Sequence, residues 1–152
     1  MSHSPRASIV SGYFSPLHVG HLDMFEAARA RSGTLIVIVN NDAQQLLKKG
    51  RLIIPDTERL RIVQSMRVVD DALVSVDEDA WIDTTFDEVR RRYPDHDLEF
   101  CNGGDRPATT VPSAEAASAE RNGIEMVYGV GGEEKADSST RILEALEGGV
   151  QP

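Results

Sequence analysis

The sequence has little of three things that would place it outside the ordinary soluble globular proteins. Cys101 is the only cysteine, so no disulfide can form within the chain, which fits a reducing compartment. The longest apolar run, Leu35–Val39, is too short to span a bilayer. The N-terminal sequence MSHSPRAS lacks the apolar region of a signal peptide. These absences predict a cytoplasmic protein without a membrane partner, in which Cys101 fills a buried strand.

Positive charge is also scarce. Lys and Arg total 16 against 25 Asp and Glu, which gives a formal net charge of -9. A protein that binds nucleic acid generally needs a basic face, so the composition argues against that class of partner. It does not exclude one bound nucleotide, because a few local cations can hold a triphosphate. The chain has 152 residues, the usual size of one domain, and neither a repeat nor a linker divides it. We expect a single domain over residues 1–152, frayed from about residue 148.

Short apolar segments alternate with amphipathic ones along the chain. Strands are predicted from Ile9 and at Leu35–Val39, Ala72–Val76, Leu98–Cys101 and Ile124–Tyr128. Helices are predicted at Val19–Ser32, Asp56–Met66 with Asp56 as the N-cap, Trp81–Tyr93, Ala114–Arg121 and Ser138–Leu146. A turn at residues 40–42 and a basic loop at residues 48–51 complete the pattern. This alternation predicts an α/β fold: a Rossmann-like, doubly wound parallel sheet of about five strands in three α/β/α layers.

The segment Gly12–His21, GYFSPLHVGH, carries the strongest chemical signal. It lies between the first strand and the first helix, where doubly wound sheets bind their ligands. His18 and His21 are three residues apart, so both side chains face one side of the first helical turn. Gly20 lets the backbone approach a ligand, and a helix N-terminus already attracts anions. The segment therefore predicts an anion site whose imidazoles donate hydrogen bonds.

Two plainer interpretations of this histidine pair are open. Either side chain could serve only in capping or packing. The pair could also bind zinc, but the neighbouring residues offer no cysteine or carboxylate at ligand spacing, so no metal ligand is predicted.

The sequence resembles the cytidylyltransferase-like nucleotidyltransferases over Ile9 to about Leu146. HVGH matches their HxGH signature, and the resemblance continues through later segments in the same order. These are LIVIVNND at residues 35–42, ERLRIVQSMRVVDDAL at residues 58–73, NGGDR at residues 102–106 and SSTRI at residues 138–142. This resemblance implies the predicted fold and the transfer of a nucleoside monophosphate with release of pyrophosphate.

The resemblance implies four catalytic residues. His18 and His21 would stabilise charge on the α-phosphate as it becomes five-coordinate. Lys48 would bind the triphosphate or the acceptor phosphate, although a solvated loop lysine, or Lys49 in the same role, are alternatives. Arg67 would reach the nucleotide or the acceptor, with a surface salt bridge as its alternative.

Further residues would bind the nucleotide. The turn after Gly103 would approach the base and ribose, unless it is a plain glycine-rich turn, and the start of the last helix would bind the β- and γ-phosphates while capping itself. A weaker candidate is Lys135. The nucleotide-binding set implied by the resemblance is Tyr13, Phe14, Ser15, Gly20, Gly103, Gly104, Asp105, Ser138, Ser139, Thr140 and Arg141.

The substrates are less well defined than the reaction. Several cytidylyltransferases carry an aspartate where this chain has Ser15, and FSPLH is similar to the FNPxH form of dinucleotide-forming adenylyltransferases. We expect CTP as the nucleotide, with ATP as the alternative, Mg²⁺ as the cofactor, and a small phosphate or phosphonate acceptor. The resemblance also implies a homo-oligomer, in the first place a dimer. A nucleotide-binding module without catalysis is the alternative of another class, whereas a fragment of a class I aminoacyl-tRNA synthetase would need a basic tRNA surface that this composition does not offer.

Overall fold

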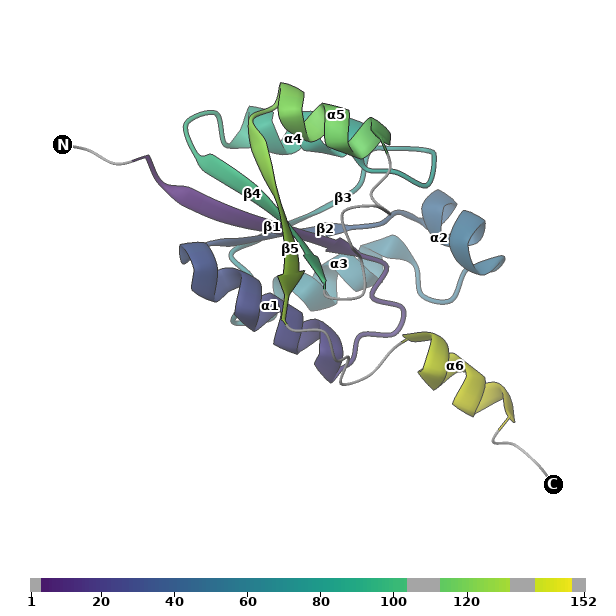
Figure 1. The fold of residues 1–152 in the computed structure, drawn as a ribbon. Coiled ribbons are helices and arrows are strands. Elements are labelled where there is room, and N and C mark those ends of the chain that lie inside the picture. The colour runs from purple at the N-terminus through teal and green to yellow at the C-terminus, as the bar shows by residue number, and fades with distance from the viewer. Residues whose placement is uncertain (1–3, 104–112, 132–138, 149–152) are drawn as a thin grey trace.

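A computed structural model describes residues 4–103, 113–131 and 139–148 of the chain. The described part contains five strands that alternate with helices, as the sequence predicts (Figure 1). The elements in chain order are β1 (Arg6–Gly12), α1 (Val19–Ser32), β2 (Leu35–Val39), α2 (Asp42–Lys49), α3 (Asp56–Gln64), β3 (Asp71–Val74), α4 (Asp83–Arg92), β4 (Asp97–Gly103), α5 (Ser113–Arg121), β5 (Ile124–Val130) and α6 (Ser139–Gly148).

The five strands form one parallel sheet in the order β3-β2-β1-β4-β5. The chain winds outward from β1 through β2 to β3, then crosses back to β4 and continues to β5. The direction of winding therefore reverses between β1 and β4, and this is the point where doubly wound sheets bind ligands. The order and the parallel pairing confirm the predicted fold class.

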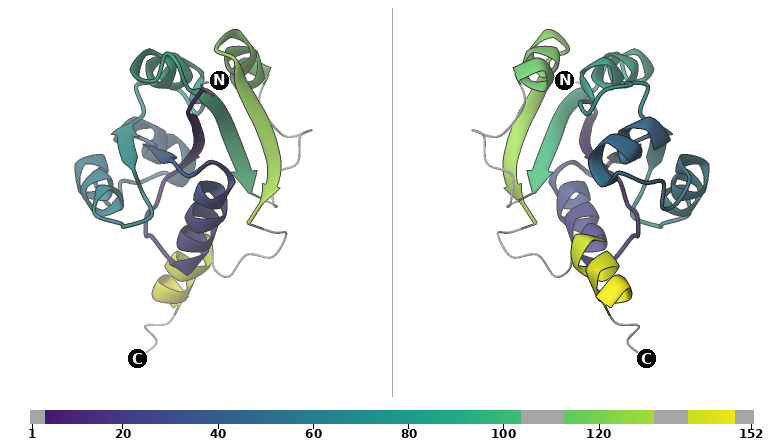
Figure 2. Two further views of the ribbon diagram at one scale, coloured as in Figure 1. Left: turned by 90° about the vertical axis from the view of Figure 1, so that its left-hand side faces the viewer. Right: turned by 90° about the vertical axis from the view of Figure 1, so that its right-hand side faces the viewer.

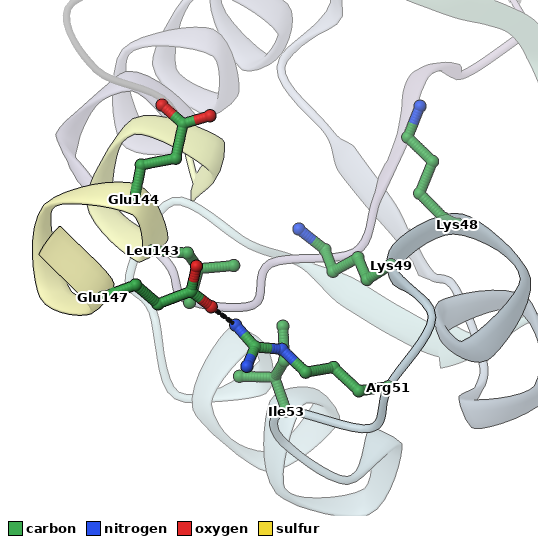
Figure 3. Close-up of a pocket in the computed structure, with 7 residues that line it drawn as sticks. All are labelled: Lys48, Lys49, Arg51, Ile53, Leu143, Glu144 and Glu147. Atoms are coloured by element: carbon green, nitrogen blue, oxygen red, sulfur yellow. Dashed lines mark hydrogen bonds and ion pairs between the residues drawn. The ribbon is translucent and has the colours of Figure 1, made fainter.

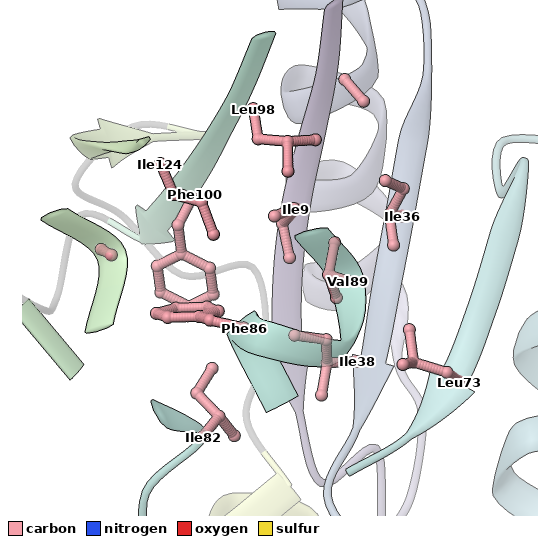
Figure 4. Packing of buried hydrophobic residues seen from close by; sticks show 12 residues of the cluster. Ile9, Ile36, Ile38, Leu73, Ile82, Phe86, Val89, Leu98, Phe100 and Ile124 are labelled. Atoms are coloured by element: carbon pink, nitrogen blue, oxygen red, sulfur yellow. The ribbon is translucent and has the colours of Figure 1, made fainter. Parts of the chain in front are cut away.

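Apolar side chains cover both faces of the sheet, and helices pack against each face (Figure 2). On one face, the strands pack against Phe25 and Ala28 of α1 and Val63 of α3. On the other face, Phe86 of α4 meets Phe100 of β4 edge-to-face at a ring-centroid distance of 5.0 Å (Figure 4). The result is a three-layer α/β/α domain.

Cys101 lies in β4 with 2% of its surface exposed, as the sequence predicts for a strand filler. Burial, reinforced by the charge of Glu99, raises the pKa of its thiol to about 12. The thiol is therefore protonated at neutral pH and has little nucleophilic character.

The largest difference from the sequence prediction is α2. Residues 48–51 were expected to form a basic loop, but Lys48 and Lys49 are the last two residues of this helix, which Gly50 ends in a left-handed conformation. The helix begins because the Asn41 side chain accepts a hydrogen bond from the backbone N–H of Gln44, whose own side chain accepts one from the N–H of Asn41. Residues 40–42 thus start a helix instead of completing a turn.

Other element boundaries shift by a few residues. The helix α3 ends at Gln64 instead of Met66, and its N-cap is Pro55, so the expected capping role of Asp56 is wrong. Asp56 is instead the first helical residue and exchanges hydrogen bonds with Asp42, each carboxylate accepting from the other residue's backbone N–H. Only α1 and β2 begin and end at the predicted residues. Within the described ranges, no helix is long and apolar enough to cross a membrane.

Candidate active site

The histidine turn, residues 13–18, joins the carboxyl end of β1 to the first residue of α1. The carboxyl ends of the parallel strands form one edge of the sheet, hereafter the carboxyl edge, and their amino ends form the opposite amino edge. Because β1 borders the point where the winding reverses, the turn lies at the place that the fold prepares for a ligand.

His18 and His21 together cap α1. The N–H of Gly20 donates to Nδ1 of His18 over 3.1 Å, and the N–H of His18 donates to Nδ1 of His21 over 3.2 Å. The two rings stack with centroids 3.8 Å apart. Because both Nδ1 atoms accept hydrogen bonds, both neutral rings must carry their hydrogen on Nε2. The hydrogen bonds that cap α1 therefore also select the tautomer with an Nε2–H, which can donate to a phosphate.

The ring of Phe14 packs against the ring of His21. Its ring meets that of His21 edge-on at 5.0 Å and that of Phe25 at 5.4 Å, and only 3% of its surface is exposed. Its backbone has a φ of 53°, an uncommon conformation for a residue with a side chain. Gly12 permits this arrangement, since a Cβ there would lie 2.7 Å from the Phe14 ring. Phe14 thus packs beneath the site, although its contact with a nucleotide was predicted.

Ser15 is fully buried, and its hydroxyl donates to Oε1 of Gln45 over 2.6 Å. Gln45 is also fully buried, in α2. Its Oε1 accepts from the N–H of Ile53, and its Nε2 donates to the carbonyl of Ile54. A side chain without exposed surface supports the turn instead of facing a nucleotide, which differs from the role that the resemblance implies for Ser15.

Arg59 ties the same region together from α3. Its side chain is fully buried, and it donates to the carbonyls of Tyr13, Asn40 and Ile54 and to the carboxylate of Asp42. A buried guanidinium is costly unless its donors are satisfied, and here every partner belongs to a segment at the carboxyl edge. Arg59 therefore holds the histidine turn, the end of β2 and the residues before α3 in fixed relation.

A pocket of about 390 Å³ lies between the C-terminal end of α2 and α6 (Figure 3). One wall carries Lys48, Lys49 and Arg51, which we call the basic cluster, and α6 contributes Glu144 and Glu147. Arg51 forms an ion pair with Glu147 across the opening. The structure thus brings the predicted Lys48 and its alternative Lys49 into one pocket.

Positive charge is crowded at this pocket. Burial lowers the pKa of Lys49, and repulsion from Lys48 and Arg59 lowers it further. An anion bound between the lysines would relieve that repulsion, so the pocket is electrostatically suited to a phosphate or phosphonate group. This local concentration of positive charge contrasts with the protein's net charge of -9.

The neighbouring strand β4 ends at the same edge. Asn102 is 2% exposed; its Nδ2 donates to the carbonyl of Val127, and its Oδ1 is buried without a hydrogen-bond partner among the described residues. The predicted Gly103 is the last residue of β4 and pairs with Val130. The predicted residues Gly104, Asp105 and Ser138, and the weaker candidate Lys135, lie outside the described residues.

The predicted phosphate-binding segment opens α6, which begins at Ser139 and continues through Thr140. Arg141 is exposed in the first turn of this helix. Both the basic cluster and α6 border the pocket, so the backbone arrangement brings the two predicted phosphate-binding segments to one region. Nucleotide binding by these residues stays a prediction.

Arg67 lies away from the other predicted catalytic residues. It is exposed in the connection between α3 and β3, ahead of the amino end of β3. That connection belongs to the amino edge, because Asp70, three residues after Arg67, accepts a hydrogen bond from the N–H of Leu35, the first residue of β2. A direct role for Arg67 beside His18 is therefore not supported by this arrangement within one chain.

Among the described residues, one group of carboxylates has the spacing of a metal site. Ligand atoms of Asp77, Asp79 and Asp83 lie within 4.8 Å of one another in the connection from β3 to α4. Asp77, however, already accepts hydrogen bonds from the backbone of Thr84 and from the backbone and hydroxyl of Thr85. Its burial is explained by these hydrogen bonds to the first turn of α4.

Sequence reasoning missed Gln45, Arg51 and Arg59 as residues of the site. The spacing of Arg59 and Val63 would have placed both on one face of α3, and both are indeed fully buried. A buried arginine contradicts the general preference of charged residues for the surface, which is why the pattern gave no direct signal.

The family to which the chain belongs follows from comparison with known proteins. The model of the cytidylyltransferase-like family matches residues 9–144, so the chain belongs to the cytidylyltransferase-like nucleotidyltransferase family. The match includes the histidine turn, the basic cluster and the start of α6.

Relatives within the family differ in their activities. The chain is 30% identical over 141 residues to the bifunctional protein HldE of Koribacter versatilis, covering 91% of this chain and 26% of that protein. It is 39% identical over 71 residues to an FAD synthase of Methanohalophilus mahii, covering 47% of this chain and 49% of that protein. It is 27% identical over 107 residues to an ethanolamine-phosphate cytidylyltransferase of Arabidopsis thaliana, covering 70% of this chain and 24% of that protein. The chain thus spans between a quarter and a half of the length of these relatives.

A solved structure shares the fold. A lipopolysaccharide core biosynthesis protein from Thermoplasma volcanium superposes with a TM-score of 0.63, covering 87% of this chain and 98% of that chain. At 20% sequence identity, this likeness supports the three-layer architecture alone.

Proposed function

We propose that the protein transfers CMP from CTP to a small acceptor that carries a phosphate or phosphonate group, with release of pyrophosphate. The observation that carries the proposal is the paired imidazoles at the N-terminus of α1, both fixed with hydrogen on Nε2. Such donors match the charge that develops on an α-phosphate under attack. Family membership supports the reaction class.

The proposed reaction is an in-line displacement at the α-phosphate. An oxygen of the acceptor's phosphate or phosphonate bonds to the phosphorus while the bond to the pyrophosphate oxygen breaks. The acceptor is already ionised at neutral pH, so positioning and charge stabilisation suffice and no general base is required. His18 and His21 would donate from Nε2 to the α-phosphate, and Lys48 and Lys49 would hold the anionic group of the acceptor.

Mg²⁺ belongs to the proposal as a companion of the nucleotide. It would offset the charge of the triphosphate, whose oxygens it prefers as ligands together with water. The Nδ1 atoms of His18 and His21 already accept hydrogen bonds, which fits an ion that arrives with the nucleotide. The homo-oligomer, in the first place a dimer, is likewise part of this proposal.

The alternative nucleotide is ATP. Relatives in the family include an FAD synthase, whose product contains adenine, and an ethanolamine-phosphate cytidylyltransferase, so membership is compatible with either base. A nucleotide-binding module without catalysis is the alternative of another class, and the complete histidine pair argues against it.

Pyrophosphate release tests the proposal. The enzyme would be assayed with CTP or ATP and Mg²⁺ against glycerol 3-phosphate, heptose 1-phosphate, phosphocholine, phosphoethanolamine and 2-hydroxyethylphosphonate. We expect release with CTP and one of these acceptors. Release with ATP alone would show that the nucleotide substrate is ATP instead of CTP, with the same mechanism. Binding of nucleotide without release, across this panel and a wider set of phosphates and phosphonates, would favour the non-catalytic module.

A further inference from the structure

Gln45 is the centre of a buried link between the histidine turn and the basic cluster. Its Oε1 accepts from the hydroxyl of Ser15 over 2.6 Å and from the N–H groups of Ile53 and Ile54 over 3.2 and 3.5 Å. Its Nε2 donates to the carbonyl of Ile54 over 3.0 Å. We propose that Gln45 is a positioning residue for the proposed transfer, on which this inference rests.

One oxygen atom thereby fixes two parts of the site. Ser15 precedes His18 by three residues in the turn that places the imidazole. Ile53 lines the pocket and follows Arg51 of the basic cluster by two residues. A shift of Oε1 would therefore displace the phosphate-binding histidine and the acceptor pocket relative to each other, and catalysis by positioning is sensitive to displacements of this kind.

The hydrogen-bond pattern also defines the amide orientation. The two N–H groups require an acceptor and the Ile54 carbonyl requires a donor, so Oε1 and Nε2 cannot exchange places without losing these bonds. An apolar side chain of similar size would fill the space but make none of these contacts. The position thus calls for an amide by its contacts and not only by its volume.

The preceding residue of the same helix offers a matched control. Gln44 is equally buried and its side chain also makes four hydrogen bonds. Its partners are Asn40, Asn41 and the carbonyls of Asp79 and Trp81, so it secures the start of α2 and the connection to α4. The two glutamines match in type, burial and number of bonds, and differ in whether those bonds reach the histidine turn.

The first test compares Gln45→Leu with Gln44→Leu in the full chain. With CTP, Mg²⁺ and the acceptor that supports turnover, we expect Gln45→Leu to lower kcat/KM for the acceptor more than tenfold. The dissociation constant of CTP, measured by calorimetry without acceptor, should change less than threefold. Gln44→Leu should lose thermal stability to a similar extent but keep kcat/KM per folded molecule within about threefold. Equal kinetic losses in the two variants would overturn the positioning role.

Conservative variants locate the effect in the Ser15 contact. Gln45→Glu keeps an acceptor for Ser15 and for the N–H groups, so its kcat/KM should lie above that of Gln45→Leu. Ser15→Ala should lower kcat/KM less than Gln45→Leu, and adding it to Gln45→Leu should cause no further loss, because the shared bond is already absent. Full additivity of the two losses would contradict a shared link.

A second readout does not depend on turnover. Nitrogen-15 NMR of the imidazole rings reports the tautomer and environment of His18 and His21. We expect these signals to move in Gln45→Leu and to stay at their wild-type positions in Gln44→Leu. Unchanged histidine signals in a folded Gln45→Leu would refute the inference. If the signals move as expected while no acceptor is turned over, the proposed function fails and the positioning link stands.

Discussion

The two edges of the sheet differ in how most of their charged residues are used. At the amino edge, arginines of α1 are paired with carboxylates: Arg29 with Asp70 at 3.0 Å, and Arg31 with the buried Glu99 at 2.9 Å. At the carboxyl edge, Arg59 donates chiefly to backbone carbonyls, and Lys48 and Lys49 stand together in an open pocket. Paired charges fasten strands and helices, whereas crowded like charges attract a ligand.

This difference assigns stability to one edge and chemistry to the other. The amino edge fixes the start of β2, because Asp70 accepts from both Arg29 and the N–H of Leu35. The carboxyl edge carries the imidazoles and the basic cluster. Substitutions at the two edges should therefore separate into those that change turnover and those that change the free energy of unfolding.

His18→Ala should have the largest effect on turnover. Loss of one donor to a developing anion typically lowers kcat by about 10²–10³-fold. His18→Asn is the sharper variant, because asparagine is a good N-cap and can replace the capping role while lacking the Nε2 donor. We expect both variants to lose turnover and His18→Asn to keep the wild-type melting temperature. If His18→Asn kept wild-type turnover, the role of His18 would be limited to capping α1.

Lys49→Ala should raise the KM for the acceptor by about tenfold, the lower end of what loss of a charged hydrogen bond costs. The sign of its pH dependence follows from the lowered pKa: Lys49 loses its charge at a lower pH than an ordinary lysine. Acceptor KM should therefore rise with increasing pH in the wild type before ordinary lysines titrate. In Lys49→Arg, whose charge persists, this rise should move to higher pH; identical profiles for wild type and Lys49→Arg would exclude Lys49 as the titrating group.

Gly12→Ala should lower kcat severalfold through the packing beneath His21. The new Cβ would lie 2.7 Å from the Phe14 ring, which must shift and disturb its contact with the imidazole. Overpacking of this kind costs about 1–3 kcal/mol of folding free energy, measurable by denaturant titration. Gly33→Ala, in an open position with its own strained φ of 90°, serves as a control that should lose stability without losing turnover.

Arg67→Ala should change turnover by less than about twofold, because Arg67 belongs to the amino edge. Steady-state kinetics would check this directly beside His18→Ala. A loss approaching that of His18→Ala would restore the catalytic role that the resemblance implies and would require Arg67 to act in the site of a second copy of the chain.

Asp70→Ala should leave turnover unchanged and lower stability, by about 1 kcal/mol or less for an exposed ion pair. The hydrogen bond from Arg29 holds the pKa of Asp70 below its ordinary value. A depressed carboxyl pKa adds stability above the unfolded-state pKa, and this contribution is lost as the pH falls through the folded-state pKa. The difference between variant and wild type in denaturant titrations should therefore disappear in acid; a constant difference across pH would argue against the ion pair.

The sequence predicted the layers of the fold because its apolar strands are short, continuous and regularly spaced. The five apolar residues Leu35–Val39 form β2 with no exposed surface, and Gly33 ends α1 in a left-handed conformation. It did not predict α2, since the polar residues 40–42 were interpreted as a turn. The reciprocal hydrogen bonds of Asn41 and Gln44 show that the same residues start a helix.

Prediction of side-chain placement succeeded where a local pattern determines geometry. Two histidines three residues apart at a helix start must lie together, and they stack. The location of Arg67 could not be predicted, because position in the sequence does not reveal which edge of the sheet a connection occupies. The roles of Gln45 and Arg59 could not be predicted either, because they depend on partners that lie 30 and 46 residues away, at Ser15 and Tyr13 respectively.

Mapping where nucleotide binds would show whether the carboxyl edge of the sheet carries the chemistry. Backbone amide spectra would be recorded as CTP or ATP is added with Mg²⁺. We predict that the largest shifts occur at residues 13–21 and 139–141. Shifts concentrated at residues 29–35 and 66–71, around Asp70 and Arg67, would place the nucleotide at the amino edge and contradict the account.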